Sequence, residues 1–110
     1  MSIEHKTLAQ GNWGNLSLIE QMANIGSEVV RALNWKEKNN PDYYNKARLR
    51  ALELLDFTIN DPKNRFRLTE ITRLREVFVD YFWFDNIFKS TSESWKKYFF
   101  HFVYAARKNC

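Results

Sequence analysis

Between Leu68 and Phe88 the hydrophobic residues recur at steps of three and four, which is the spacing of one face of an α-helix. The residues on this face are Ile71, Leu74, Phe78, Tyr81 and Phe82. A polar row with the same period lies opposite and consists of Thr69, Arg73, Glu76 and Asp80. A helix this rich in aromatic residues must be covered by other helices, so the segment predicts the centre of a helical domain.

A second helix is predicted before it, starting near Ser17. Ser17 and Glu20 form a capping-box pattern, and the helical pattern fades within residues 36–39. Its inward stripe is predicted to be Ile19, Met22, Gly26, Val29, Val30 and Leu33. Glycine costs about 1 kcal/mol relative to alanine inside a helix, so Gly26 indicates a packing reason, the close approach of another helix.

Two further helices complete the pattern. One begins at Asn40–Pro41, where proline is tolerated in a first turn, and runs to about Asn60. Its shared face is Tyr44, Ala47, Ala51, Leu54, Leu55 and Thr58. The last helix spans about residues 91–108, after a second capping-box pattern formed by Ser90 and Glu93. Its inward residues are Trp95, Tyr98, Phe99, Phe102, Ala105 and Ala106.

Four helices joined by short connections favour antiparallel neighbours. The sequence therefore predicts an all-α fold, an up-down-up-down four-helix bundle in one domain over residues 16–110, preceded by a polar arm over residues 1–15. Trp13 lies in this arm between two glycines. A tryptophan in such an arm docks into its own domain or into a partner chain. We favour the own domain, because burying one tryptophan is worth a few kcal/mol.

Composition narrows the class of protein without identifying its role. The 110 residues suffice for one domain, and 45% hydrophobic with 27% charged residues is typical of a soluble globular protein. Aromatic residues make up 16% of the chain, more than a small core needs, which predicts that some rings lie in an interface. A formal net charge of +4 permits contact with nucleic acid without arguing for it.

The cysteine content and the apolar runs bear on the compartment. Cys110 is the only cysteine, so no internal disulfide can form, which fits a reducing cytoplasm. The first fifteen residues hold no apolar run typical of a secretory signal, and no run anywhere reaches membrane-spanning length. We therefore expect a cytoplasmic protein without membrane contact.

Two carboxylates of the polar row, Glu76 and Asp80, lie one helical turn apart, and like charges at that spacing repel. Arg73 on the same helix could compensate them, as could Arg48 and Arg50 on the preceding helix. We interpret these five residues as a structural ion-pair network at a helix interface. A carboxylate pair that holds a metal is the alternative. The chain lacks the Glu-x-x-His motifs of di-metal bundles, so no metal site is predicted.

The outer face of the last helix interleaves basic groups with rings: Lys97, Phe100, His101, Tyr104 and Lys108. Such a face suits bases stacked on rings with phosphates against the charges, or a subunit interface. We favour an interface, to which we assign Trp13, Phe100 and Tyr104. For nucleic acid, the binding residues would be Arg65, Lys96, Lys97, His101, Tyr104 and Lys108.

No constellation around a catalytic nucleophile is visible. The chain contains no G-x-S-x-G motif, no cysteine beside a histidine and no Walker-type glycine loop. We therefore predict no catalytic residue and no cofactor, and the sequence does not favour an enzyme.

Residues 47–56, Ala-Arg-Leu-Arg-Ala-Leu-Glu-Leu-Leu-Asp, and the later pattern Arg73-x-Arg75-Glu76-x-x-x-Asp80 resemble the HEPN superfamily, which includes the nucleotidyltransferase substrate-binding helical bundles. The resemblance covers about residues 16–108. It implies a homodimer or a pairing with a small nucleotidyltransferase, and in some members RNA cleavage. Residues 20–28 are also similar to short bacterial four-helix proteins, which implies no activity.

Ribonuclease members of that superfamily carry an arginine shortly before a histidine near the last helix. Here Ser94, Trp95 and Lys96 occupy the three positions from which such an arginine could reach His101, so Lys96 is a partial match and no arginine is present. Lysine keeps the charge but lacks the planar fork that grips phosphate. We therefore expect a non-enzymatic helical interaction module that self-associates or pairs with a small nucleotidyltransferase-like protein. The alternative is a HEPN-like protein that binds or cleaves nucleic acid.

Overall fold

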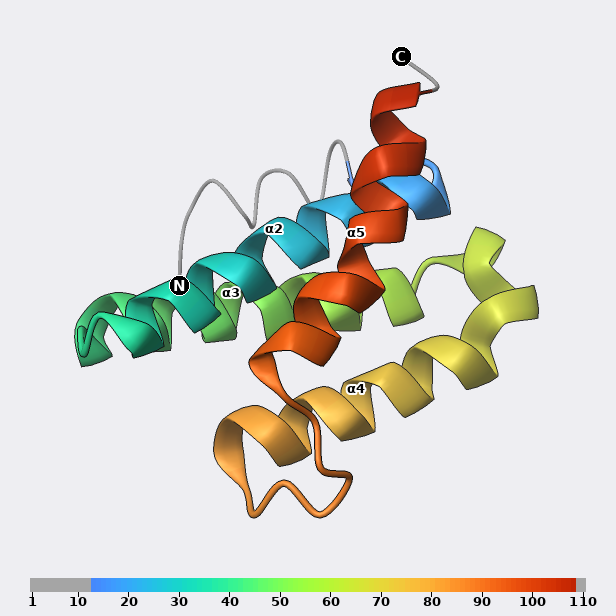
Figure 1. Ribbon diagram of the computed structural model, residues 1–110. Coiled ribbons are helices and arrows are strands. Elements are labelled where there is room, and N and C mark those ends of the chain that lie inside the picture. The colour runs from blue at the N-terminus through green and yellow to red at the C-terminus, as the bar shows by residue number, and fades with distance from the viewer. Residues whose placement is uncertain (1–12, 109–110) are drawn as a thin grey trace.

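The computed structural model describes residues 13–108, which are helical and contain no strand (Figure 1). The elements are η2 (Trp13–Asn15), α2 (Leu18–Glu37), α3 (Pro41–Ile59), η3 (Pro62–Arg67), α4 (Leu68–Trp83) and α5 (Ser92–Lys108). The predicted all-α fold with four α-helices is confirmed. The arm before Trp13, and Cys110, fall outside the described residues. None of the described helices is both long and apolar enough to span a membrane.

The first two helix starts agree with the predicted caps. At the start of α2 the Ser17 hydroxyl accepts the Glu20 N–H, while the Glu20 carboxylate accepts the Ser17 N–H at 3.0 Å. The Ser17 N–H, and then the Ser17 side chain, hydrogen-bond the Glu20 carboxylate and lower its pKa below its ordinary value. Asn40 caps α3 by accepting the Tyr43 N–H, with Pro41 in the first turn. Local capping signals therefore set both starts.

The cap predicted for the last helix is wrong by one residue. Thr91 and Ser94 form the reciprocal pair, with N–H to hydroxyl distances of 2.9 and 3.0 Å. The Ser90 N–H, which the predicted capping box would direct to Glu93, donates to the Asn86 side chain instead, and the Ser90 carbonyl accepts from the same amide. The capping box of α5 is thus Thr91 with Ser94 instead of Ser90 with Glu93.

Helix α4 ends at Trp83, five residues before the predicted end at Phe88. The Asp80 carboxylate accepts the N–H groups of Ile87 and Phe88 at 2.9 and 3.0 Å, which folds the chain back over the helix end. Asn86 has a φ of 56°, a left-handed conformation that asparagine tolerates and a continuing helix forbids. The hydrophobic run therefore continues into a loop.

Helix α2 is the centre of the fold, because it packs along both α3 and α5, whereas α3 also packs along α4. Figure 1 shows α5 crossing α2 obliquely. At the crossing, a Cβ added at Gly26 would lie 2.7 Å from the Cβ of Phe99. The close approach expected at Gly26 is therefore present. Buried hydrophobic residues of α2 are Met22, Ile25, Val29, Ala32 and Leu33.

The predicted inward stripe of α2 needs correction at both edges. Ile19 is 37% exposed, whereas Ile25, predicted on neither face, is fully buried. Gln21 and Glu28 are buried too. The reason is that two helices cover α2 from different sides, so its buried surface is wider than one amphipathic stripe.

Trp13 is buried in its own domain, with 2% of its surface exposed. Its indole N–H donates to the Thr58 hydroxyl at 3.1 Å, and its carbonyl accepts from the Gln21 amide. Asn64 of η3 donates to Gln21 and to the Thr58 carbonyl, both at 2.9 Å. This buried network joins the start of the described chain to the corner between α3 and α4. Trp13 is thus a core residue, and its assignment to an interface with another chain is wrong.

Candidate functional site

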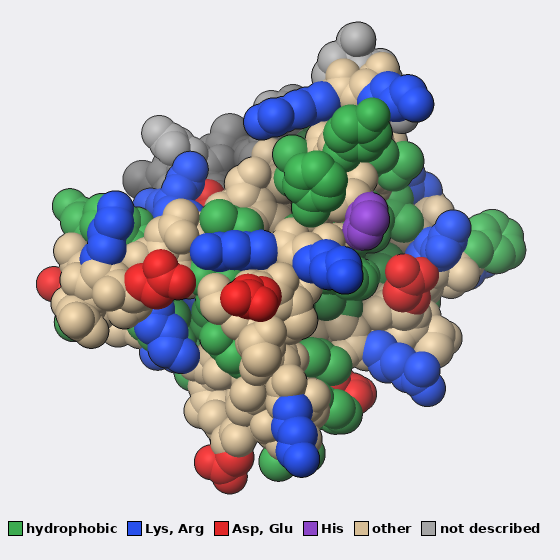
Figure 2. Space-filling view, viewed as in Figure 1, with side chains coloured by type: hydrophobic (Ala, Val, Ile, Leu, Met, Phe, Trp, Pro, Cys, Tyr) green, Lys and Arg blue, Asp and Glu red, His purple; other side chains and the backbone are tan. Residues whose placement is uncertain are grey.

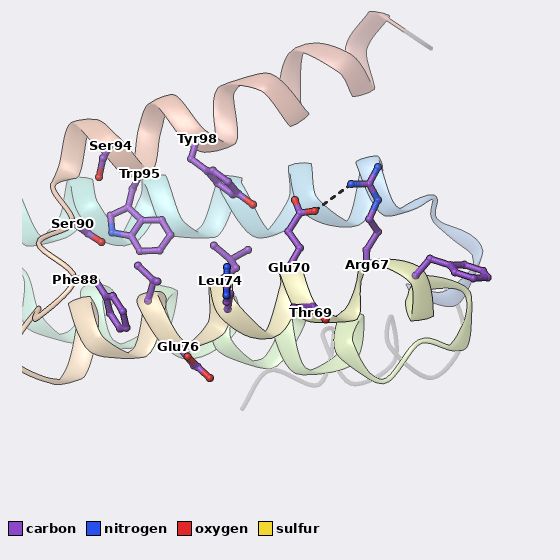
Figure 3. A pocket seen from close by; sticks show the side chains of 13 residues that line it. Arg67, Thr69, Glu70, Leu74, Glu76, Phe88, Ser90, Ser94, Trp95 and Tyr98 are labelled. Carbon is purple, nitrogen blue, oxygen red and sulfur yellow. Dashed lines mark hydrogen bonds and ion pairs between the residues drawn. The ribbon is translucent and has the colours of Figure 1, made fainter.

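A groove of about 1100 Å³ separates α4 from α5 (Figure 3). Its floor is apolar and is formed by Leu74, Val77, Trp95 and Tyr98. In the described part of the chain, every ring contact between these two helices runs through Trp95, which meets Phe78, Tyr81 and Phe82 at centroid distances of 6.0–6.2 Å. Trp95 therefore joins the helices at one end and leaves the rest of this side open.

The two ends of the groove carry exposed phenylalanines. Phe66, in η3, is 91% exposed, and Phe88, in the loop before α5, is 53% exposed. Neither residue belongs to a predicted helix face or candidate site. The sequence does indicate that Phe66 is exposed. It is a lone aromatic residue between Arg65 and Arg67, in a polar connection that lies outside the periodic hydrophobic faces of the helices.

Polar residues line the α4 edge of the groove. Thr69, Arg73 and Glu76, three members of the predicted polar row, are exposed there. Arg67 and Glu70 form an exposed ion pair at 3.2 Å, drawn as a dashed line in Figure 3. Figure 3 also shows Tyr98 reaching from α5 towards Glu70. Burial, and then the charge of Glu70, raises the pKa of Tyr98 above its ordinary value.

The predicted ion-pair network around Glu76 and Asp80 is absent from residues 13–108, where neither carboxylate pairs with an arginine. Both oxygens of Asp80 are taken by loop N–H groups, and Glu76 is exposed. The ion pair that does join α3 to α4 is Asp56 with Arg75, at 2.6 Å. The described chain also contains no cluster of three His, Cys, Asp or Glu side chains suited to a metal ion.

The arginines assigned to that network lie elsewhere. Arg48 donates to the Phe82 carbonyl at the end of α4, and its guanidinium lies 4.7 Å from the Tyr44 ring centre and 4.5 Å from that of Trp83. Arg48 therefore fastens α3 to α4 by stacking and a helix-end hydrogen bond. Arg50 lies on the same helix beside Glu53 and Asp56, away from the carboxylates it was expected to meet.

The basic and aromatic face of α5 is exposed as the sequence analysis expected. Lys97, Phe100, His101, Tyr104 and Lys108 are all exposed. Figure 2 shows basic and hydrophobic side chains interleaved over α5. The rings of Phe100 and Tyr104 are stacked, with centroids 6.2 Å apart and planes 23° from parallel. A surface with two parallel rings between cations can take stacked or anionic groups.

Two residues assigned to nucleic acid do not join that face. Lys96 is half-buried, and on the regular helix α5 the separation of five positions between Lys96 and His101 turns the two side chains about 140° apart. Arg65 is in η3, where its guanidinium lies over the Phe66 ring at 5.7 Å. The partial ribonuclease motif therefore does not bring its two groups together.

Comparison with protein-family models, with curated proteins and with solved structures yields no match. An apolar groove with a polar edge is suited to binding the hydrophobic face of another helix. The apolar floor offers contact surface, and the charged residues of the edge offer ionic contacts.

Proposed function

We propose that this chain is a non-enzymatic interaction module that binds an amphipathic helix of a protein partner in the groove between α4 and α5. The observation that carries the proposal is the open side of the helical domain. Leu74, Val77 and Tyr98 line a groove that a further helix would fill, because the ring contacts that join α4 to α5 in the described chain all lie at the Trp95 end. Helix-in-groove binding uses surfaces of this kind.

The groove dimensions and charges define the partner helix. From Thr69 to Val77 the α4 edge spans about 12 Å at 1.5 Å per residue, so a partner helix of about three turns would cover it. Its apolar residues should recur at i, i+3 or i+4, and i+7. Arg73 lies on the α4 edge, and Lys97 and His101 lie one turn from the Ser94 and Tyr98 positions of the α5 edge. Acidic residues beside the partner's apolar stripe would complement these cations.

The predicted up-down-up-down arrangement stays part of the proposal. A regular bundle gives each helix two neighbours, and a partner helix in the groove would supply the missing neighbour of α4. The partner class implied by the HEPN-like resemblance, a small nucleotidyltransferase, likewise stays part of the proposal.

A photo-crosslinking amino acid at Tyr98 tests the groove directly in cells that make the full chain. We expect an adduct whose mass exceeds the 13.3 kDa of this chain, and whose cross-linked peptide is an amphipathic helix with acidic flanks. Placing the same group at Tyr43, a half-exposed tyrosine of α3, supplies the matched control. Val77→Glu should abolish the Tyr98 adduct by putting a charge on the apolar floor. Adducts that form equally from Tyr43, or persist in Val77→Glu, would refute the proposal.

Nucleic acid is the second candidate, favoured by the stacked and exposed Phe100 and Tyr104 rings among Lys97, His101 and Lys108. RNA cleavage belongs to this candidate through the HEPN-like resemblance. Anisotropy of a short single-stranded RNA at low salt tests binding, because phosphate contacts are strongest there. Tyr104→Ala should cost about 1–3 kcal/mol of affinity per stacked base, whereas Tyr43→Ala should leave it unchanged. Absence of binding at low salt removes this candidate.

A further inference from the structure

The outward side of α4 carries two opposite charges. Arg73 and Glu76 are exposed and three residues apart, yet in the described part of the chain neither takes part in an ion pair, with each other or with another residue. Figure 3 shows Glu76 pointing away from α5 and the groove floor. This row, Thr69 with Arg73 and Glu76, is called the α4 outer face below.

A row of this kind is complementary to itself. About a two-fold axis, a contact of residue i with residue j is always accompanied by the contact of j with i. If two α4 helices lie antiparallel with Arg73 opposite the partner's Glu76, the same operation places Glu76 opposite the partner's Arg73. The axis then passes at the level midway between Leu74 and Arg75. Two ion pairs form where the isolated chain has two uncompensated charges.

The two ends of α4 give the same register independently. Residue 83 lies as far from the axis on one side as Phe66 lies on the other, and it is next to a hollow of about 420 Å³. The hollow is lined by the hydrophobic residues Val79, Phe84, Ile87 and Phe88 and by the charged residues Arg75, Glu76, Asp80 and Asp85. Phe66 projects from the opposite end of α4 and is 91% exposed. The register set by the charges therefore brings each exposed Phe66 ring to the hydrophobic side of this hollow in the other copy.

From this agreement we infer that two copies of this chain pair through the α4 outer face, with their α4 helices antiparallel and Phe66 of each copy in the hollow beside Phe84 of the other. At roughly 200 Å² of surface per ring, the exposed parts of Phe66, Phe84 and Phe88 offer about 400 Å² per copy. One partner of a standard interface buries about 800 Å², so the rings supply about half and the polar row the remainder. The pairing goes beyond the groove proposal, because its occupant is a second copy of this chain. It shares the α4 edge residues Thr69, Arg73 and Glu76 with the groove but does not use the groove floor.

Charge reversal in the full chain, with Cys110→Ser in all variants, tests the register by sedimentation equilibrium. The parent chain is expected at twice 13.3 kDa at micromolar concentration. Arg73→Glu places like charges at both contacts and should raise the dimer dissociation constant about tenfold. Adding Glu76→Arg to it restores both pairs in reverse and should return the constant to within about threefold of the parent. Lys46→Glu, an equal charge change on exposed α3 surface, should have no effect.

The remaining outcomes separate the two proposals. Phe66→Ala should weaken the dimer, and its failure to do so would refute the Phe66 placement. A monomer at all concentrations overturns the pairing, while the Tyr98 cross-link is still free to support the groove. A dimer that resists Arg73→Glu but breaks in Val77→Glu overturns this register and assigns the association to the groove. If the variant with both Arg73→Glu and Glu76→Arg dimerises as weakly as Arg73→Glu alone, the proposed register is overturned as well.

Discussion

Gly26 of α2 and Phe99 of α5 touch at the crossing of the two helices, where a Cβ on Gly26 would lie 2.7 Å from the Phe99 Cβ and 2.9 Å from its ring. The closest atom is rigidly attached to the α5 backbone, so a methyl group at Gly26 must move a helix. We expect Gly26→Ala to destabilise the fold by about 1–2 kcal/mol, with overpacking outweighing the better helix propensity of alanine. Urea denaturation measures this free energy of unfolding.

Gly14→Ala is the control, because a Cβ there meets no atom within 4 Å. It should change the free energy of unfolding by no more than about 0.5 kcal/mol. A Gly26→Ala protein as stable as the parent would show that α2 and α5 are not in contact at this level.

Trp13 stabilises the domain through burial and through its hydrogen bond to Thr58. Trp13→Ala should cost about 3–5 kcal/mol of unfolding free energy, the range for truncating a buried aromatic. Trp35→Ala should cost clearly less, because Trp35 is half-buried at the end of α2 and packs mainly on Tyr43. Thermal and chemical denaturation measure the loss of stability in both variants. Equal losses in Trp13→Ala and Trp35→Ala would contradict a core position for Trp13.

Arg48→Lys tests the stacking between α3 and α4. Lysine keeps the charge but loses the planar contact with both rings and the directed hydrogen bond to Phe82. We expect a loss of about 1–2 kcal/mol in stability, since each exposed cation–π contact is worth about 0.5–1 kcal/mol. Arg50→Lys on the same helix is the matched variant and should be close to neutral. A larger loss of stability in Arg50→Lys than in Arg48→Lys would indicate that Arg48 does not anchor α4.

Asp80 should hold the loop after α4 closed. Asp80→Ala removes the acceptor of the Ile87 and Phe88 N–H groups, and we expect a loss of about 2–3 kcal/mol, because hydrogen bonds to a charged group are the stronger ones. Hydrogen exchange at those two amides should accelerate while α2 amides change little. Glu37→Ala, in the exposed last turn of α2, should change neither exchange nor stability beyond about 0.5 kcal/mol.

Asp61 predicts an acid-dependent part of the stability. Partial burial acts to raise the pKa of Asp61, but hydrogen bonds from Lys63 and Gln21 outweigh it and hold the pKa below its ordinary value of 3.8. A lowered folded-state pKa stabilises the fold above the unfolded-state value, and that contribution is lost as the pH falls through the folded-state pKa. The unfolding free energy should therefore decline below about pH 4. Asp61→Asn should flatten this decline, and an unchanged slope would contradict the ionised role.

Local patterns predicted those features that neighbours in sequence decide. The three- and four-residue spacing identified Ile71, Leu74 and Phe78 as buried, because a helix puts such residues on one side whatever surrounds it. The Ser17 cap was predictable for the same reason, since its partner is three residues away. The end of α4 was not predictable in this way. Asp80 accepts N–H groups of a loop seven and eight residues later, and the helical spacing does not indicate that the chain folds back there.

The groove depends on how helices distant in the sequence are placed. The sequence contained the polar row of α4 and the basic, aromatic face of α5, but the angle at which α5 crosses α2 decides whether α4 and α5 meet. That angle depends on Gly26 against Phe99 and on Trp95 against Phe78, contacts between residues far apart in the chain. The predicted ion-pair network failed for the same reason. Arg48 contacts the end of α4 and Asp80 contacts a loop, because a side chain pairs with the groups that the packed helices bring near it.

By itself, then, the sequence determined that this protein is helical, where most helices begin and which face of each is hydrophobic, since these follow from bonding within a few residues. Only the tertiary structure decided that Trp13 belongs to the core and that Asp80 closes a loop. It also decided that one side of the domain stays open between α4 and α5. Those outcomes depend on how rigid helices pack against one another. Packing is decided by contacts between residues far apart in the sequence, so the pattern of one helix does not determine it.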